Sequence, residues 1–234
     1  ETLSTLNSAG LKSGIILDQI RFTVGDWDMD HLKIIKEIIK YFNSGEIVVR
    51  SSNFAEDNEN ETAAGKFESV LKVKLNKEDI KKAVNNVILS YGKDCSNDEQ
   101  LLVQRCLDNI DYSGVAFSRN IQTNGPYLVI NLSKKNTSDV TSGKKCDEIF
   151  IARNSLNLVK DEILKRVLDC VFEIEQLLKF QCLDFEFAIK GQDFYILQVR
   201  KLKTYKNDDD DNFIFEEIKT SSSFLNKYLK NNNT

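Results

Sequence analysis

Three short stretches of this 234-residue chain carry side chains that could bind a phosphorylated nucleotide. The first begins with Arg50, which ends the strand pattern 46–50. An arginine at the end of a buried strand presents a permanently charged, planar fork to the neighbouring cleft, and this fork suits phosphate oxygens. The alternative is a structural ion pair between Arg50 and the acidic residues at 56–57.

The same stretch continues into a run of small and basic residues, Ala64, Gly65 and Lys66. Small residues let backbone N–H groups approach an anion closely, and Lys66 would add a point charge. Neither of the common phosphate loops occurs, since the chain has no G-x-x-x-x-G-K-[ST] and no G-x-G-x-x-G after a strand. A nucleotide site in this protein would therefore use another device.

The second stretch is a hairpin pattern in which residues 185–189 alternate, 190–193 supply the turn and 194–199 return. Glu186 and Gln198 would stand on the paired strands, with Arg200 two positions further on the same face. A carboxylate and an amide oxygen suit Mg²⁺, and Arg200 would neutralise charge on a transferred phosphoryl group.

The alternative for this hairpin is a polar outer face without a ligand. Four apolar residues are expected to share its opposite, buried face: Phe185, Phe187, Tyr195 and Leu197.

The third stretch contains Gln104, which ends a strand pattern near the middle of the chain. A connection between two lobes at this point could offer backbone groups to an adenine edge. Ser113 and Gly114 follow shortly afterwards and would permit tight backbone approach.

The elements that must position these residues alternate between period-2 and period-3.6 patterns. Strands are expected at residues 14–17, 20–24, 46–50, 67–73, 101–104, 112–117, 127–132, 148–152, 185–189 and 194–199. Helices are expected between Asp30 and Ser44 and over residues 77–91, 158–178 and 213–229. The acidic run 208–211 is interpreted as a solvated linker.

Composition favours a soluble globular unit, with 41% hydrophobic residues and a formal net charge of −4. This charge argues against binding to nucleic acid or to an anionic membrane. Five cysteines without a C-x-x-C pair and a single histidine, His31, do not make a zinc site. The odd cysteine count and the lack of a signal peptide or membrane-spanning run predict a cytoplasmic protein.

Taken together, the three stretches resemble motif blocks of phosphoenolpyruvate synthase and pyruvate phosphate dikinase. Residues 49–52 with 56–57 and 64–65 resemble the V-R-S-S-x-x-x-E-D…A-G block. Residues 103–104 and 113–117 resemble V-Q…S-G-V-A-F, and residues 184–186 and 197–200 resemble D-x-E…L-Q-x-R. The blocks occur in the family's order over residues 46–203.

The resemblance implies a two-lobed ATP-grasp fold of the α/β (α+β) class, with mixed and antiparallel sheets and with ATP held between the lobes. The expected division is an N-terminal lobe over residues 1–100, a C-terminal lobe over 101–205, and a linker and tail over 206–234. It also implies roles for matching residues. Phosphate contacts are expected from Arg50, Ala64, Gly65, Lys66 and Arg200, an adenine-side contact from Gln104, and Mg²⁺ ligands from Glu186 and Gln198.

In this family the β-phosphoryl group of ATP passes to a histidine of a swivelling domain, and AMP and phosphate are released. His31 does not match that histidine, so the chain is expected to be the ATP-binding part of a longer polypeptide. A phosphate-binding lysine of the family would precede Glu1. The family's G-L-G-E segment is replaced between Tyr127 and Thr141, which puts its ligand contacts there in question.

Residues 22–24, 126–127 and 140–143 resemble dikinase-like proteins of bacterial surface-polysaccharide gene clusters, including the glutamine kinases of capsule phosphoramidate synthesis. The expected acceptor is then the amide nitrogen of L-glutamine. Two alternatives remain, namely a phosphoenolpyruvate synthase-type fragment acting on pyruvate and a module that binds nucleotide without turnover.

Overall fold

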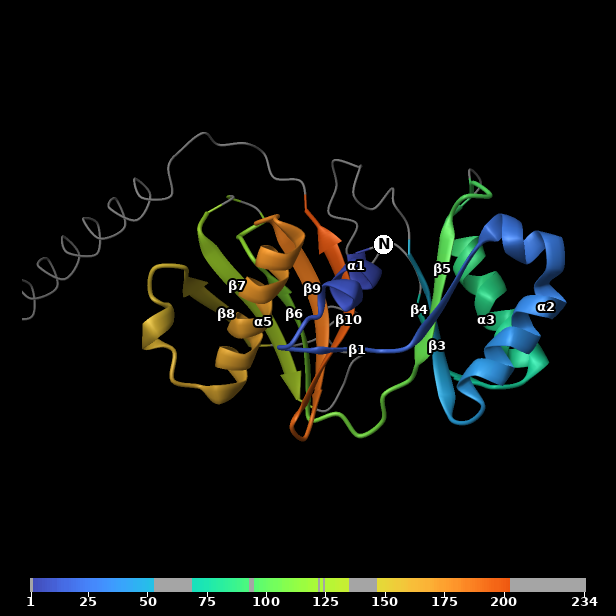
Figure 1. Cartoon of the computed structure of the whole chain (residues 1–234), viewed down its shortest axis with the longest axis horizontal. Coiled ribbons are helices and arrows are strands. Elements are labelled where there is room, and N and C mark those ends of the chain that lie inside the picture. The colour runs from blue at the N-terminus through green and yellow to red at the C-terminus, as the bar shows by residue number, and fades with distance from the viewer. Residues whose placement is uncertain are drawn as a thin grey trace, which may run out of the picture.

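The structure is a computed structural model, and it describes residues 2–52, 69–92, 95–121, 123, 125–134 and 147–202. These residues form two lobes, each built on its own sheet (Figure 1). The smaller sheet has the strand order β2-β5-β3-β4, and the larger has the order β1-β10-β9-β6-β7-β8. The predicted acidic linker and the helix at 213–229 lie outside the described residues.

The smaller sheet is antiparallel throughout. Its strands are β2 (Gln19–Thr23), β3 (Glu46–Ser51), β4 (Ser69–Lys74) and β5 (Gln100–Arg105). Helices α2 (Val24–Phe42) and α3 (Lys77–Ser90) cover the face that points away from the larger lobe (Figure 1). Their apolar stripes and the sheet's alternate residues form one core.

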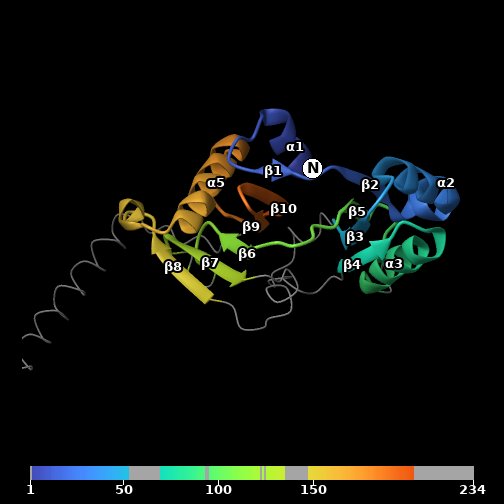
Figure 2. The same ribbon diagram turned by 90° about the horizontal axis from the view of Figure 1, so that it is seen from below.

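The larger sheet is mixed, because β1 pairs in parallel with β10 and all other neighbours are antiparallel. Its strands are β1 (Ile15–Ile16), β6 (Tyr112–Phe117), β7 (Tyr127–Lys134), β8 (Asp147–Ala152), β9 (Leu183–Lys190) and β10 (Asp193–Lys201). Helices α1 (Thr2–Ala9) and α5 (Glu162–Leu178) lie on one face (Figure 2). The α/β class with mixed and antiparallel sheets is confirmed.

The chain passes between the lobes twice, because residues 2–16 belong to the larger lobe. It enters the smaller lobe between β1 and β2 and returns through residues 106–111, between β5 and β6 (Figure 1). The carboxylate of Glu173 on α5 accepts the backbone N–H groups of Lys12 and Ser13 at 2.9 and 2.7 Å, which fastens the first segment to the larger lobe.

This path differs from the expected boundary at residues 100 and 101. Strand β5 pairs with β2 and β3 in the smaller sheet, whereas α1 and β1 join the larger lobe. Which lobe these elements join depends on strand pairing between residues far apart in the chain, and local sequence patterns do not encode such pairing.

Helix α2 begins earlier than expected, at a capping box in which Thr23 and Asp26 exchange hydrogen bonds. Asp30, where the sequence pattern placed the start, has non-helical angles (φ −153°, ψ 72°) and accepts the Lys33 N–H at 3.0 Å. The pattern therefore located a second start within a kinked helix. Helix α5 also begins later than predicted, at Glu162, after the 3-10 turn Leu156–Leu158.

Gly114 allows a close approach within the larger sheet. It pairs with Leu132 of β7 and Phe187 of β9, and a Cβ at this position would lie 2.5 Å from both the Asn131 carbonyl oxygen and the Phe187 ring. The missing side chain thus leaves room for the Phe187 ring in the core.

Gly114→Ala is expected to lower the free energy of unfolding by about 1–3 kcal/mol, because the Cβ overpacks the core. Urea unfolding followed by circular dichroism measures this change. A loss below about 0.5 kcal/mol, the range typical of neutral surface substitutions, would show that β6 moves aside easily.

Candidate nucleotide site between the lobes

Arg50 and Glu186 form an ion pair that joins the two lobes. The Arg50 Nη1 donates to Glu186 Oε2 at 3.1 Å, and the two side chains are 7% and 17% exposed. Arg50 stands on β3 of the smaller sheet and Glu186 on β9 of the larger one. The structure therefore brings together two of the predicted site residues that are 136 positions apart in the chain.

Strand alternation explains why Arg50 faces the other lobe. Ile47 and Val49 are fully buried in the core of the smaller lobe, so Arg50 projects from the opposite face of β3. Leu102 on β5 is the register partner of Arg50, and it packs against the core of the larger lobe. The ion pair is thus part of the contact between the lobes, and no carboxylate at 56–57 is described.

The predicted hairpin is confirmed, with Gln198 on β10 opposite Glu186 on β9. Two residues further along β10, Arg200 lies opposite Asp184. Its guanidinium donates to both carboxylate oxygens, from Nε to Oδ1 at 3.1 Å and from Nη2 to Oδ2 at 2.6 Å. A two-point contact fixes the plane of the guanidinium as well as its position. Four polar side chains therefore follow one another along one face of this hairpin.

Asp184 is almost completely buried, at 2% exposure of its side chain. Burial raises the pKa of this carboxyl group, and the charge and hydrogen bonds of Arg200 act in the opposite direction. The sequence motif contained Asp184, but its alternation pattern gave no sign that the residue would hold Arg200.

The expectation that Tyr195 and Leu197 share a face with Phe185 and Phe187 is wrong. A β-bulge between Ile196 and Gln198 inserts an extra residue, and Ile196 takes the place in the core beside Phe187. Tyr195 and Leu197 belong to a separate small cluster with Ile110 and Ala188. This cluster packs beside the returning segment 106–111.

Gln104 is 1% exposed near the end of β5, two residues before the chain returns to the larger lobe. Its Nε2 donates to Gln19 Oε1 on β2 at a long 3.5 Å. Next to it, Arg105 donates to the carbonyl oxygens of Phe42, the last residue of α2, and of Ser44 just beyond it. Gln104 thus stands near the interlobe connection, as expected, while the hydrogen bonds of Arg105 lie within the smaller lobe.

Several predicted residues lie outside the described part of the chain: Ala64, Gly65, Lys66, the acidic pair at 56–57 and residues 140–143. The part of 127–141 that is described forms strand β7, Tyr127–Lys134.

The sequence patterns did not single out Arg21, a further arginine on the inner face of the smaller sheet. Arg21 is the register partner of Leu102 on β2, as Arg50 is on β3, and its neighbour Phe22 is buried in the core. Strands lie about 4.8 Å apart, so the two arginine backbones are about 10 Å apart. Burial lowers the pKa of Arg21. The alternation of Ile20 and Phe22 could have indicated this orientation.

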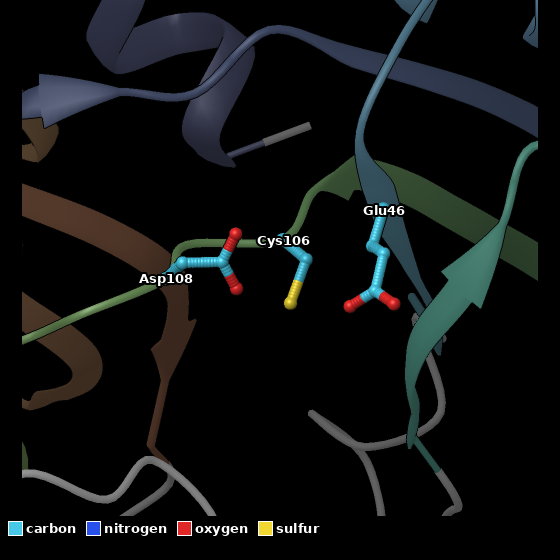
Figure 3. Close-up of side chains that lie close together, drawn as sticks. All are labelled: Glu46, Cys106 and Asp108. Atoms are coloured by element: carbon cyan, nitrogen blue, oxygen red, sulfur yellow. The ribbon is translucent and has the colours of Figure 1, made fainter.

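A different group of possible metal ligands lies at the return segment, where Glu46, Cys106 and Asp108 approach one another within 4.8 Å (Figure 3). The Cys106 N–H donates to the Glu46 carbonyl oxygen at 2.9 Å, which accounts for their proximity. Burial raises the pKa of the Cys106 thiol, so the thiolate that a metal would need is disfavoured. A thiol is also a poor ligand for Mg²⁺.

The donor set between the lobes fits a complex of a hard cation with an anion. Glu186 and Gln198 offer oxygen atoms, which Mg²⁺ prefers, and Arg50 and Arg200 offer donors to phosphate. The buried Arg50 Nε has no hydrogen-bond partner among the described residues, so this guanidinium has a donor left for a ligand. In the described part of the chain, no helix has the length and apolar character needed to span a bilayer.

A family model matches a large part of the sequence. The family model "Pyruvate phosphate dikinase, AMP/ATP-binding domain" matches residues 26–156, which is more than half of the chain. A comparison with curated proteins found no match.

Among solved structures, PH1788 from Pyrococcus horikoshii aligns with a TM-score of 0.52 at 14% identity, over 86% of this chain and 88% of that one. The D-alanine-D-alanine ligase from Coxiella burnetii gives 0.48 at 9% identity, over 88% and 47%. The ATP complex of the Bacillus anthracis ligase gives 0.45 at 12%, over 93% and 58%. The chain spans about half the length of such ligases, and of the three only PH1788, above 0.5, bears on the fold.

Proposed function

Because this chain belongs to the pyruvate phosphate dikinase AMP/ATP-binding domain family, and is an ATP-binding domain of ATP-grasp fold, we propose that it holds Mg-ATP between its lobes and catalyses a dikinase-type phosphoryl transfer. The observation that carries the proposal is the meeting of Arg50 from β3 with Glu186 from β9. An opposed cation and anion at a lobe boundary match the two halves of a metal–phosphate complex.

We assign the phosphate side to Arg50 and Arg200. Both are guanidinium groups held on regular strands, and both are largely shielded from solvent. In such a setting a fixed positive charge stabilises developing phosphoryl charge more than it would in water. Arg21 adds positive charge on the same face as Arg50, and the segment with Ala64, Gly65 and Lys66 is proposed to cover the phosphates.

The metal side is assigned to Glu186 and Gln198, which are opposite one another on the hairpin. Mg²⁺ bound there would bridge phosphate oxygens and offset their charge. Asp184 acts as a positioning residue, because both its oxygens accept from Arg200 and fix the direction of that guanidinium. Gln104, beside the return segment, is proposed to lie near the adenine.

In the reaction proposed, ATP, a histidine side chain and water give AMP, the phosphorylated histidine and inorganic phosphate, with the β-phosphoryl group on the histidine and the γ-phosphoryl group on water. The histidine belongs to a swivelling domain of the same polypeptide, which then carries the β-phosphoryl group to an acceptor. We propose the amide nitrogen of L-glutamine as this acceptor, on the resemblance of residues 22–24, 126–127 and 140–143 to capsule-modifying dikinase-like proteins.

Product analysis by ³¹P NMR tests this function with the intact enzyme, Mg²⁺ and ATP. We expect AMP and inorganic phosphate in equal amounts, and with L-glutamine added a signal from a phosphorus–nitrogen bond. Formation of ADP would contradict dikinase chemistry. Phosphoenolpyruvate from added pyruvate would replace the proposed acceptor, and nucleotide binding without turnover would identify a binding module.

A further inference from the structure

We propose that the Arg50–Glu186 ion pair is an exchangeable latch that makes metal and nucleotide binding strongly interdependent. In the structure the two charges pair with each other across the lobe boundary. When ligands bind, phosphate replaces Glu186 at Arg50 and the metal ion replaces Arg50 at Glu186. This inference rests on the proposed function, and it adds how the site is regulated.

The pair is made in a way that permits exchange. One hydrogen bond of 3.1 Å joins Arg50 Nη1 to Glu186 Oε2, and the buried Nε of Arg50 has no partner among the described residues. The Arg200–Asp184 pair, by contrast, has two donor–acceptor contacts within one hairpin. In the pair of Arg153 and Glu175, both carboxylate oxygens accept from the arginine, which also donates to the Ser118 carbonyl oxygen.

Removing one partner alone from this latch is unfavourable. A shielded charge that loses its partner costs far more than an exposed one, because water cannot replace the contact. Metal-free ATP would draw Arg50 toward phosphate and leave the Glu186 carboxylate close to a polyanion. A metal ion alone would draw Glu186 away and leave Arg50 unpaired.

The metal–nucleotide complex avoids both penalties, because it brings a cation for Glu186 and an anion for Arg50 at the same time. Metal and nucleotide should therefore each raise the affinity for the other by the same factor, as linkage requires. The latch also separates this model from a simple metal ligand. If Glu186 only binds metal and does not hold Arg50, its removal changes metal-free ATP affinity only by the lost charge repulsion.

The test is calorimetry of ATP binding to the full chain and to its Glu186→Gln variant, each with excess Mg²⁺ and with EDTA. Glu186→Gln keeps the shape of the side chain but releases Arg50. We expect the variant to bind metal-free ATP about tenfold or more tightly than the unchanged protein, and to gain little from Mg²⁺. Glu148→Gln, an exposed carboxylate on β8 of the same sheet, is the control for net charge and should bind like the unchanged protein.

A second variant approaches the latch from the other side. Arg50→Met should bind Mn²⁺ without nucleotide about tenfold or more tightly than the unchanged protein, measured by electron paramagnetic resonance, because Glu186 is released. Metal-free ATP affinity that is unchanged in Glu186→Gln, or Mn²⁺ affinity that is unchanged in Arg50→Met, would overturn the latch and leave the proposed function intact. Failure of the unchanged protein to bind ATP under any condition would overturn both.

Discussion

Replacing Arg200 by lysine is expected to slow ATP consumption by the intact enzyme about 10³-fold, comparable to the loss of an arginine that stabilises phosphoryl charge. Lysine keeps the positive charge but cannot reproduce the planar two-point contact with Asp184. The ammonium group would then lie at a different point and would not be aimed at the phosphoryl group. Steady-state release of AMP at saturating Mg-ATP measures the effect.

Arg166→Lys is the matched control for this substitution. Arg166 is a half-buried arginine of α5 that donates to the Gln192 carbonyl oxygen in the turn of the same hairpin. Its replacement should change turnover by less than about twofold, since Arg166 contacts the turn at Gln192 and none of the residues assigned to the site. If Arg200→Lys behaves like Arg166→Lys, then Arg200 does not contact the transferred group.

Asp184→Ala is expected to lower the free energy of unfolding by about 3–5 kcal/mol, because Arg200 would lose its partner in a shielded position. For a chain of this size the melting temperature should fall by roughly 6–20 °C. Differential scanning calorimetry measures the fall. Asp193→Ala is the control, because Asp193 is an exposed carboxylate at the start of β10.

A melting temperature for Asp184→Ala within about 2 °C of that of Asp193→Ala would mean that water solvates Arg200 well enough to replace Asp184. The two-point contact would then contribute nothing to the stability of the fold, and the positioning role assigned to Asp184 would be wrong.

The hairpin could be predicted from sequence because its information is local. Alternation in 185–189, the turn residues at 190–193 and the returning strand together fix the register, so Glu186 was expected near Gln198. The bulge at Ile196–Gln198 has no comparable local signal. It moved Tyr195 and Leu197 away from the predicted face and left Gln198 and Arg200 in place.

The contact between Arg50 and Glu186 depends on how the two lobes pack, and no short stretch of the sequence predicts this packing. The same limit explains why the expected lobe boundary at residues 100 and 101 differs from the pairing of β5 in the smaller sheet, and why α1 was missed. Helix α1 is short, and its burial depends on α5 and β10 of the larger lobe. Motif order indicated which residues should meet, and the lobe packing supplies their geometry.

The most direct test of the site is a crystal structure of the protein with Mg²⁺ and a non-hydrolysable ATP analogue. We expect phosphate oxygens within hydrogen-bond distance of Arg50 and Arg200, and Mg²⁺ bound to Glu186 and Gln198, with the Arg50–Glu186 contact broken. A nucleotide bound elsewhere, or bound between the lobes while Arg50 still pairs with Glu186, would contradict it.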